Sequence, residues 1–136
     1  MIFKLRPKNS PWEVVGRRSV NPVAAYHEDE EEDLDIMSVR DSDIDRTYVF
    51  EVKRSKLHSV ARNAILFARQ QVLLEISKMG YNDLILEGWK LAVYEREKVH
   101  RIEVQYTGRA AHILGKVDQT RRPPFLDEVL HDWAHI

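Results

Sequence analysis

The stretch KLHSVARNAILFARQQVLLEISKMG, residues 56–80, decides the fold. Its apolar residues recur every three or four positions, which is the period of a helix with one buried face. Ser55 suits the cap at the start of such a helix, and Gly80 suits the left-handed position that ends one. The pattern predicts a long helix over 56–79 with these residues on its buried face: Leu57, Ala61, Ala64, Ile65, Ala68, Val72, Ile76 and Met79.

Alternating apolar and polar residues on both sides of this helix predict strands. Residues 46–53 alternate before it, and residues 101–107 alternate after it. Residues 84–94 change the parity of their apolar positions at Gly88, which indicates a glycine β-bulge. A last short strand is expected over 110–114.

The two ends of the chain are less regular. Residues 12–15 predict a short strand that Gly16 ends. Residues 125–136, after two prolines, predict a short amphipathic helix. These elements predict an α+β fold, in which an antiparallel sheet carries one long helix packed across it and a short C-terminal helix. The length of 136 residues fits a single domain.

The net charge of −1 conceals a strong segregation of charge. Ten acidic residues and one basic residue lie between Glu28 and Asp45, so the remainder holds 12 acidic and 20 basic residues and a charge of +8. Residues 27–45 follow neither a helical nor a strand period and predict an acidic loop. A loop of this length is unusual in a compact domain, so it is expected to be either functional or disordered.

The composition excludes several classes of protein. The absence of cysteine excludes a disulfide scaffold, a thiol nucleophile and a Cys-ligated metal site. The glycines form neither of the common nucleotide-binding loops. No apolar run approaches the ~18 residues of a membrane helix, and no membrane partner is expected. Residues 1–7 lack the apolar stretch of a signal peptide, so a cytoplasmic location is expected.

The triplet Glu51-Val52-Lys53 resembles the ExK half of the PD-(D/E)xK nuclease signature. The resemblance implies a divalent metal held by Glu51, with Lys53 steadying the attacking water or the phosphate. That family needs a further aspartate from a neighbouring strand upstream, and the acidic segment offers Asp45. The alternative is the solvated face of an ordinary strand.

A second candidate metal site lies in the C-terminal helix. His131 and His135 are four residues apart and Glu128 precedes His131 by three, so the three side chains can share one face and one metal ion. The metalloprotease pattern HExxH is absent, which excludes that class of enzyme. The alternative is a pair of incidental surface histidines.

A candidate contact surface lies on the side of the long helix away from its main apolar face. Leu66 and Leu73 are seven residues apart there, flanked by Arg62 and Arg69, and the strand that contains Trp89 is expected to extend the surface. The alternative is that the C-terminal helix or the N-terminal segment covers the two leucines. The surface predicts a non-enzymatic binding or assembly module without a cofactor, which acts through a protein partner or through self-association.

A nucleic-acid binder masked by its acidic segment is a further hypothesis. Basic residues with an aromatic neighbour such as Tyr48 can follow a phosphate backbone. No helix-turn-helix pattern or RNA-binding signature accompanies them. The basic set is Arg17, Arg18, Lys53, Arg54, Lys56, Arg62, Arg69, Arg121 and Arg122.

Residues 61–111 resemble the small YbjQ-type, dodecin-like domains. In that family a helix ends in a Gly-x-Asn turn before a strand, which Gly80 and Asn82 match. A later strand of the family carries the pattern E-V-x-x-x-G-x-A, which is matched by Glu103, Val104, Gly108 and Ala110. The resemblance implies a strand–helix–strand–strand unit that often assembles into rings through its sheet. Both motifs are structural, so no active site is implied.

Overall fold

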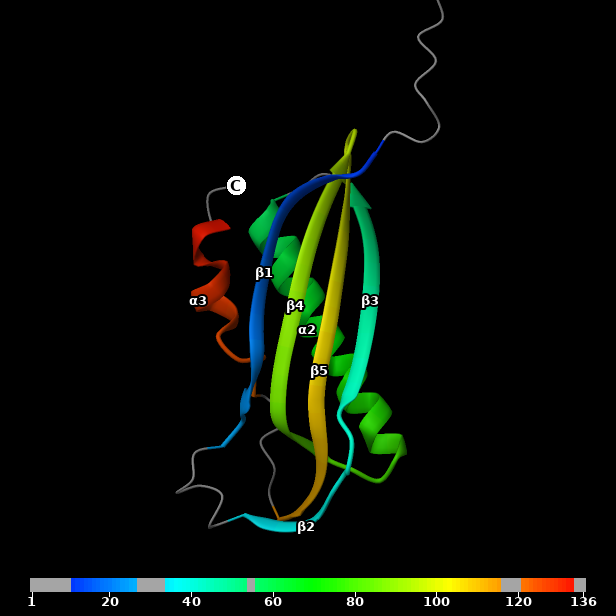
Figure 1. Cartoon of the computed structure of the whole chain (residues 1–136), viewed down its shortest axis with the longest axis vertical. Helices are drawn as coiled ribbons and strands as arrows, with labels where there is room; N and C mark the ends of the chain where they lie inside the picture. The colour runs from blue at the N-terminus through cyan, green and yellow to red at the C-terminus, as the bar shows by residue number, and fades with distance from the viewer. Residues whose placement is uncertain (1–10, 27–33, 54–55, 116–120, 134–136) are drawn as a thin grey trace, which may run out of the picture.

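A computed structural model of the chain describes residues 11–26, 34–53, 56–115 and 121–133 (Figure 1). These residues form an antiparallel sheet of five strands, one long helix and a short C-terminal helix. The predicted α+β class and its arrangement are confirmed.

The sheet is built around the longest strand. In chain order the elements are β1 (Glu13–Ala24), β2 (Asp35–Val39), β3 (Ile44–Lys53), α2 (Leu57–Lys78), β4 (Asp83–Arg96), β5 (Val99–Leu114), α3 (Leu126–Leu130) and the 3-10 helix η1 (His131–Trp133). The order across the sheet is β1-β4-β5, and the far edge of β5 is shared by β3 and β2. Because β3 and β4 both run antiparallel to β5, they are parallel to each other, and α2 is the crossover between them.

The predicted long helix is confirmed as α2. Seven of the eight residues predicted for its buried face are buried, whereas Met79, the C-cap residue, is 42% exposed. Gly80 has φ +94°, and the Tyr81 N–H donates back to Ile76 O over 3.0 Å. This is the glycine-terminated helix ending that the sequence predicted.

The hydrophobic core lies between α2 and one face of the sheet. On β5, Ile102, Val104 and Tyr106 are fully buried, as their alternation predicted. Figure 1 shows α2 behind the sheet and α3 beside β1. In the described residues no helix covers the other face of the sheet, which is called the open face below. None of the described helices has the length and apolar character needed to cross a membrane.

Three strands differ from the prediction. β1 continues through Gly16 and past Pro22, because it is an edge strand in which bulges absorb irregular residues. β2 lies inside the acidic segment predicted as a loop over 27–45; every one of its residues is exposed, so no alternation marked it. β5 runs through Gly108 without a break, because Gly108 is paired on both sides, with Ile44 of β3 and with Glu87 of β4.

The change of parity in β4 lies at Ile85, not at Gly88 as predicted. Leu84 pairs with Ala110 and Leu86 with Arg109, so Ile85 is the extra residue of a bulge. This bulge turns Glu87 to the same face as the buried apolar side chains that follow it. A carboxylate therefore enters the core.

The C-terminal helix is shorter than predicted. It is α helical only over Leu126–Leu130 and tightens into η1, and its apolar residues Leu126, Leu130 and Trp133 are buried. The predicted helix cap Ser55 and the last three residues of the chain lie outside the described residues.

Candidate functional site

The structure does not assemble the predicted nuclease site. Asp45, Glu51 and Lys53 all lie on β3 and point to its open face. Glu51 lies six positions along the strand from Asp45, a distance of about 20 Å. The Asp45 carboxylate instead accepts two hydrogen bonds of 2.9 Å from Gln105 Nε2 on the neighbouring β5. Glu51 and Lys53 therefore share one face of β3, but the fold does not bring Asp45 to them.

The structure describes two of the three residues of the predicted C-terminal metal site. Glu128 and His131 are exposed on α3 and η1, and His135 lies outside the described residues. Across the described residues, no group of three or more His, Asp or Glu side chains is arranged to hold a metal ion.

The predicted contact surface is wrong at two of its five positions. Trp89 is 1% exposed and Arg69 is 4% exposed, so neither can reach a partner. Trp89 Nε1 donates to Pro124 O over 2.9 Å, which ties the C-terminal segment to the core. Trp89 shares its parity along β4 with Leu91 and Val93, which are also buried, and that alternation was the signal that it faces the core.

The remaining three positions face the C-terminal segment. Leu66 and Leu73 are partly buried against the core and line a hollow of about 280 Å³ together with Arg121 and Pro123. Arg62 Nε donates to Asp127 Oδ1 over 2.9 Å, which lowers the pKa of that carboxyl group. The alternative, in which the chain itself covers these leucines, is thus the better description of this side of α2.

A buried ionic cluster between α2, β4 and β5 was missed by the sequence analysis. Glu87 is its centre: Arg69 Nε and Tyr106 OH each donate to Oε1 over 2.6 Å, and Arg121 Nη2 donates to Oε2 over 2.8 Å. The same Arg121 nitrogen lies 3.1 Å from Asp83 Oδ1. The sequence does contain a signal for this cluster, which is the acidic residue Glu87 within an otherwise apolar strand. If such a residue points into the core, it needs a basic partner.

The cluster perturbs the titration of its neutral and cationic members. Burial, and then the adjacent Glu87 carboxylate, raise the pKa of Tyr106. Burial and the hydrogen bond to Asp83 raise the pKa of Tyr26 to about 12. For Arg121, burial lowers the pKa, but the charges of Glu87 and Asp83 outweigh it and the net shift is upward. The tyrosines therefore remain protonated donors and the arginine remains a cation.

The geometry of the cluster indicates a structural role rather than a catalytic one. Two guanidinium groups balance two carboxylates, and the oxygens of Glu87 are occupied by three donor side chains. A carboxylate that is saturated with donors is a poor general base, because its lone pairs are already engaged. What the cluster does is hold α2, β4 and the segment around Arg121 together.

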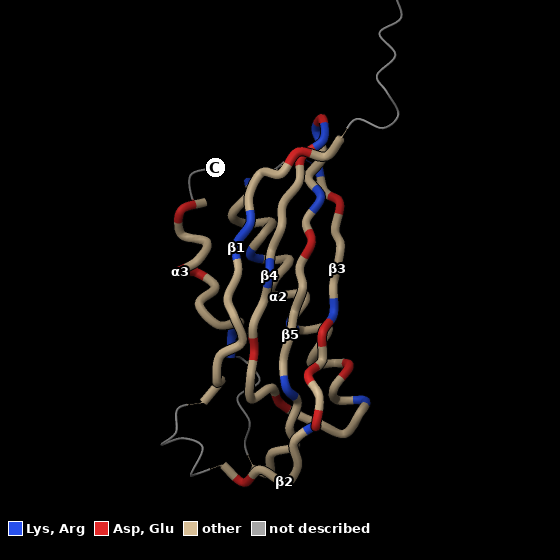
Figure 2. The backbone as a smooth tube through the Cα atoms, viewed as in Figure 1, with Lys and Arg blue, Asp and Glu red and all other residues tan. Residues whose placement is uncertain are grey.

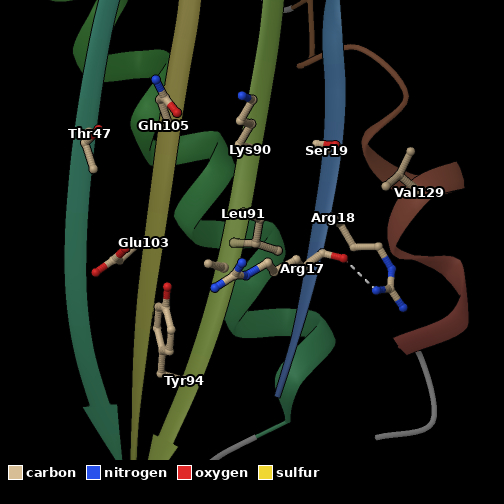
Figure 3. A pocket seen from close by; sticks show the side chains of 11 residues that line it. Arg17, Arg18, Ser19, Thr47, Lys90, Leu91, Tyr94, Glu103, Gln105 and Val129 are labelled. Atoms are coloured by element: carbon tan, nitrogen blue, oxygen red, sulfur yellow. Dashed lines mark hydrogen bonds between the residues drawn. The ribbon is translucent and has the colours of Figure 1, made fainter. Parts of the chain in front are cut away.

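A hollow of about 600 Å³ crosses the open face (Figure 3). Its lining side chains come from four strands and from α3, and they include cations, one carboxylate, neutral polar groups and a few apolar residues. Glu103 there is already paired with Arg101, at 3.5 Å. Among the described lining residues there is no histidine. The main polar lining residues are Arg17, Ser19, Thr47, Lys90, Tyr94, Glu103 and Gln105.

The basic residues do not form one surface. Figure 2 shows lysines and arginines spread along the strands and α2, interleaved with acidic residues. Several are engaged within the chain: Arg18 with Asp132, and Arg122 with Asp127 over 3.4 Å. A continuous track for a phosphate backbone is not present in the described residues.

The clearest unoccupied surface lies on the β3 side of α2. A groove of about 350 Å³ there is lined almost entirely by apolar side chains: Phe50, Val52, Val60, Asn63, Ala64 and Ile102. Further along α2, Phe67 is 44% exposed and Leu74 is 53% exposed. The Phe67 ring meets the edge of Phe50 with 5.4 Å between ring centroids. Val60, Asn63, Phe67 and Leu74 recur at helical spacing and are called the open flank below.

The open flank adjoins an unpaired strand edge. Within the described residues β3 pairs with β5 alone, over a ten-residue ladder without a register shift. The backbone groups on its other side are free to pair with another strand. The open flank and this edge together form the candidate functional site.

No protein-family model, no curated protein and no solved structure matches the chain. The resemblance of residues 61–111 to the dodecin-like domains remains a prediction.

Proposed function

We propose that the chain is a non-enzymatic binding or assembly module, which contacts another protein chain through the free edge of β3 and the open flank of α2. The observation that carries this proposal is that an unpaired strand edge and an uncovered apolar groove lie next to each other. A regular strand edge offers backbone donors and acceptors, and an apolar groove lies directly beneath it. Strand addition to such an edge is a recurring mode of protein recognition, in which adjacent pockets select the side chains.

The two edges of the sheet support this assignment by contrast. β1 carries Pro22 and two register irregularities in its pairing with β4. Proline and bulges are common devices that prevent a sheet edge from pairing with another chain. β3 contains neither a proline nor a bulge, and the apolar side chain of Val49 at its middle is 48% exposed. An edge without these devices is suited to a partner.

Site-specific photocrosslinking tests the proposal. A benzoylphenylalanine in place of Phe67 should form a discrete adduct whose mass is that of the chain plus one bound protein. The same label in place of Lys90, which is exposed on the open face, is the matched control and should form none. Equal labelling at both positions, or an adduct at neither, would overturn the proposal.

A further inference from the structure

We infer that the protein bound at this surface is a second copy of the chain, joined by antiparallel pairing of the two β3 strands about a twofold axis at Val49. The inference rests on the proposed function and names its partner. A twofold interface uses the same surface on both copies, so that surface must be complementary to itself. The sequence of β3 can be tested for this property.

The open-face side chains of β3 are complementary about Val49. In an antiparallel pair the axis passes between a residue and its own copy, and residues equally far from the axis face each other. With the axis at Val49, Asp45 of each copy faces Lys53 of the other, and Thr47 faces Glu51. Opposite charges in facing positions stabilise a strand pair, whereas like charges destabilise it.

Other axes lack this match. An axis at Tyr48 sets Asp45 against Glu51, and an axis at Glu51 sets that carboxylate against its own copy. Among the axes that pair at least half of β3, only the one at Val49 brings opposite charges face to face. That axis also leaves only Ile44 without a partner residue inside the strand.

The side of β3 that faces α2 is complementary as well. About the same axis Tyr48 faces Phe50 of the second copy, which forms an aromatic cross-strand pair on each side. Figure 1 shows α2 crossing behind the sheet, with its C-terminal end emerging past the lower end of β3. The second β3 runs in the opposite direction, so its Lys53 end lies beside the C-terminal end of α2 in the first copy. The apolar groove of the second copy lies beneath that end of its β3. Leu74 of one copy is thus directed toward the Val52 groove of the other.

Cysteine crosslinking tests the register, and the chain contains no cysteine of its own. Facing residues in an antiparallel pair have Cα atoms about 4.5–5.5 Å apart, which suits a disulfide. Oxidised Val49→Cys should therefore give a covalent dimer. The matched control is Thr47→Cys, two residues away on the same face, because its two copies would lie about 13 Å apart. The double variant Thr47→Cys/Glu51→Cys should crosslink again.

A charge exchange tests the same axis without a covalent bond. Asp45→Lys and Lys53→Asp should each weaken the dimer about tenfold, because each creates two like-charge pairs across the axis. The double variant Asp45→Lys/Lys53→Asp should recover to within about threefold of the original. Within one chain these residues are about 26 Å apart along the strand, so only pairing between copies explains the recovery.

Sedimentation velocity of the purified chain decides between the outcomes. A dimer at micromolar concentration that shows the crosslinking and charge-exchange pattern above supports the inference. A monomer at about 100 μM overturns it, and so does a dimer in which Thr47→Cys crosslinks and Val49→Cys does not. A monomer whose position 67 still photocrosslinks to a different protein overturns the inference alone and leaves the proposed function standing. Circular dichroism of each variant confirms that it is folded.

Discussion

Arg69 Nε on α2 lies 2.6 Å from Glu87 Oε1 on β4, with both side chains at most 5% exposed. The helix is thus joined to the sheet by an ion pair in the middle of an otherwise apolar layer. A buried pair of this kind contributes little net stability compared with apolar residues of the same size. Removing only one partner is costly, since the other charge is then left buried and uncompensated.

Glu87→Ala is expected to lower the free energy of unfolding by about 3–5 kcal/mol. The substitution leaves Arg69 and Arg121 without their shared carboxylate and Tyr106 without its acceptor. Glu103→Ala, which removes a half-buried carboxylate from the open face, should change stability by less than about 0.5 kcal/mol. Urea unfolding of both variants measures the difference, and equal losses would contradict the buried role of Glu87.

Stability is expected to fall as the pH rises above 10. The folded chain holds the pKa of Tyr26 at about 12 and also raises that of Tyr106, whereas an unfolded tyrosine ionises near pH 10. Between these values the unfolded chain binds fewer protons than the folded one, so the free energy of unfolding decreases with pH. The contribution is complete below pH 10 and is lost as the pH passes through the folded pKa values.

Urea unfolding measured from pH 8 to pH 12 tests this dependence. Tyr106→Phe should lower stability at pH 8, because it removes a buried hydrogen bond, by about 1 kcal/mol. The same variant should show a shallower decline above pH 10. A decline as steep as that of the original chain would show that Tyr106 does not cause it.

Gly88→Ala is expected to destabilise the β1–β4 pairing. A Cβ atom at Gly88 would lie 2.5 Å from the Pro22 nitrogen and 2.7 Å from the Val20 carbonyl oxygen. Both obstacles are backbone atoms of β1, so the strand has to move, at a cost of about 1–3 kcal/mol. Hydrogen exchange should show faster opening of β1 amides in this variant. Thr107→Ala, on the β5 residue paired with Gly88, is the control and should leave β1 protected.

The elements that could be predicted are those whose burial is periodic along the chain. α2 and the strand around Phe50 each bury one regular face, so local spacing was sufficient to find them. β2 buries no residue and β1 contains Gly16 and Pro22, so their pairing with longer strands decides their structure. Such pairing is not encoded in the spacing of apolar residues.

The candidate site was less predictable than the fold for the same reason. The side of α2 that contains Leu66 was expected to be free, yet the segment around Arg121 and Pro123 lies beside it. The side that contains Phe67 and Leu74 is the exposed one. Which side of a helix is covered depends on a chain segment some fifty residues away, and local periodicity cannot report it. The sequence analysis identified Leu66 and Leu73 outside the main buried face, but it did not identify Phe67 or Leu74.

The 3-10 helix η1 is expected to be held against β1 by the burial of Trp133 more than by the ion pair of Asp132. Trp133 is 3% exposed, and a Cβ atom placed at Gly16 would lie 2.7 Å from its ring. The Arg18 guanidinium lies 4.5 Å from the centre of the same ring and pairs with Asp132.

Trp133→Ala should therefore cost about 3–5 kcal/mol, because it leaves a large cavity beside β1. Asp132→Asn should cost far less, because that ion pair is exposed to solvent. Arg18→Ala should fall between the two, since it loses the ring contact as well as the pair. Urea unfolding of the three variants gives the ranking directly, and a loss in Asp132→Asn as large as that in Trp133→Ala would mean that the ion pair holds η1.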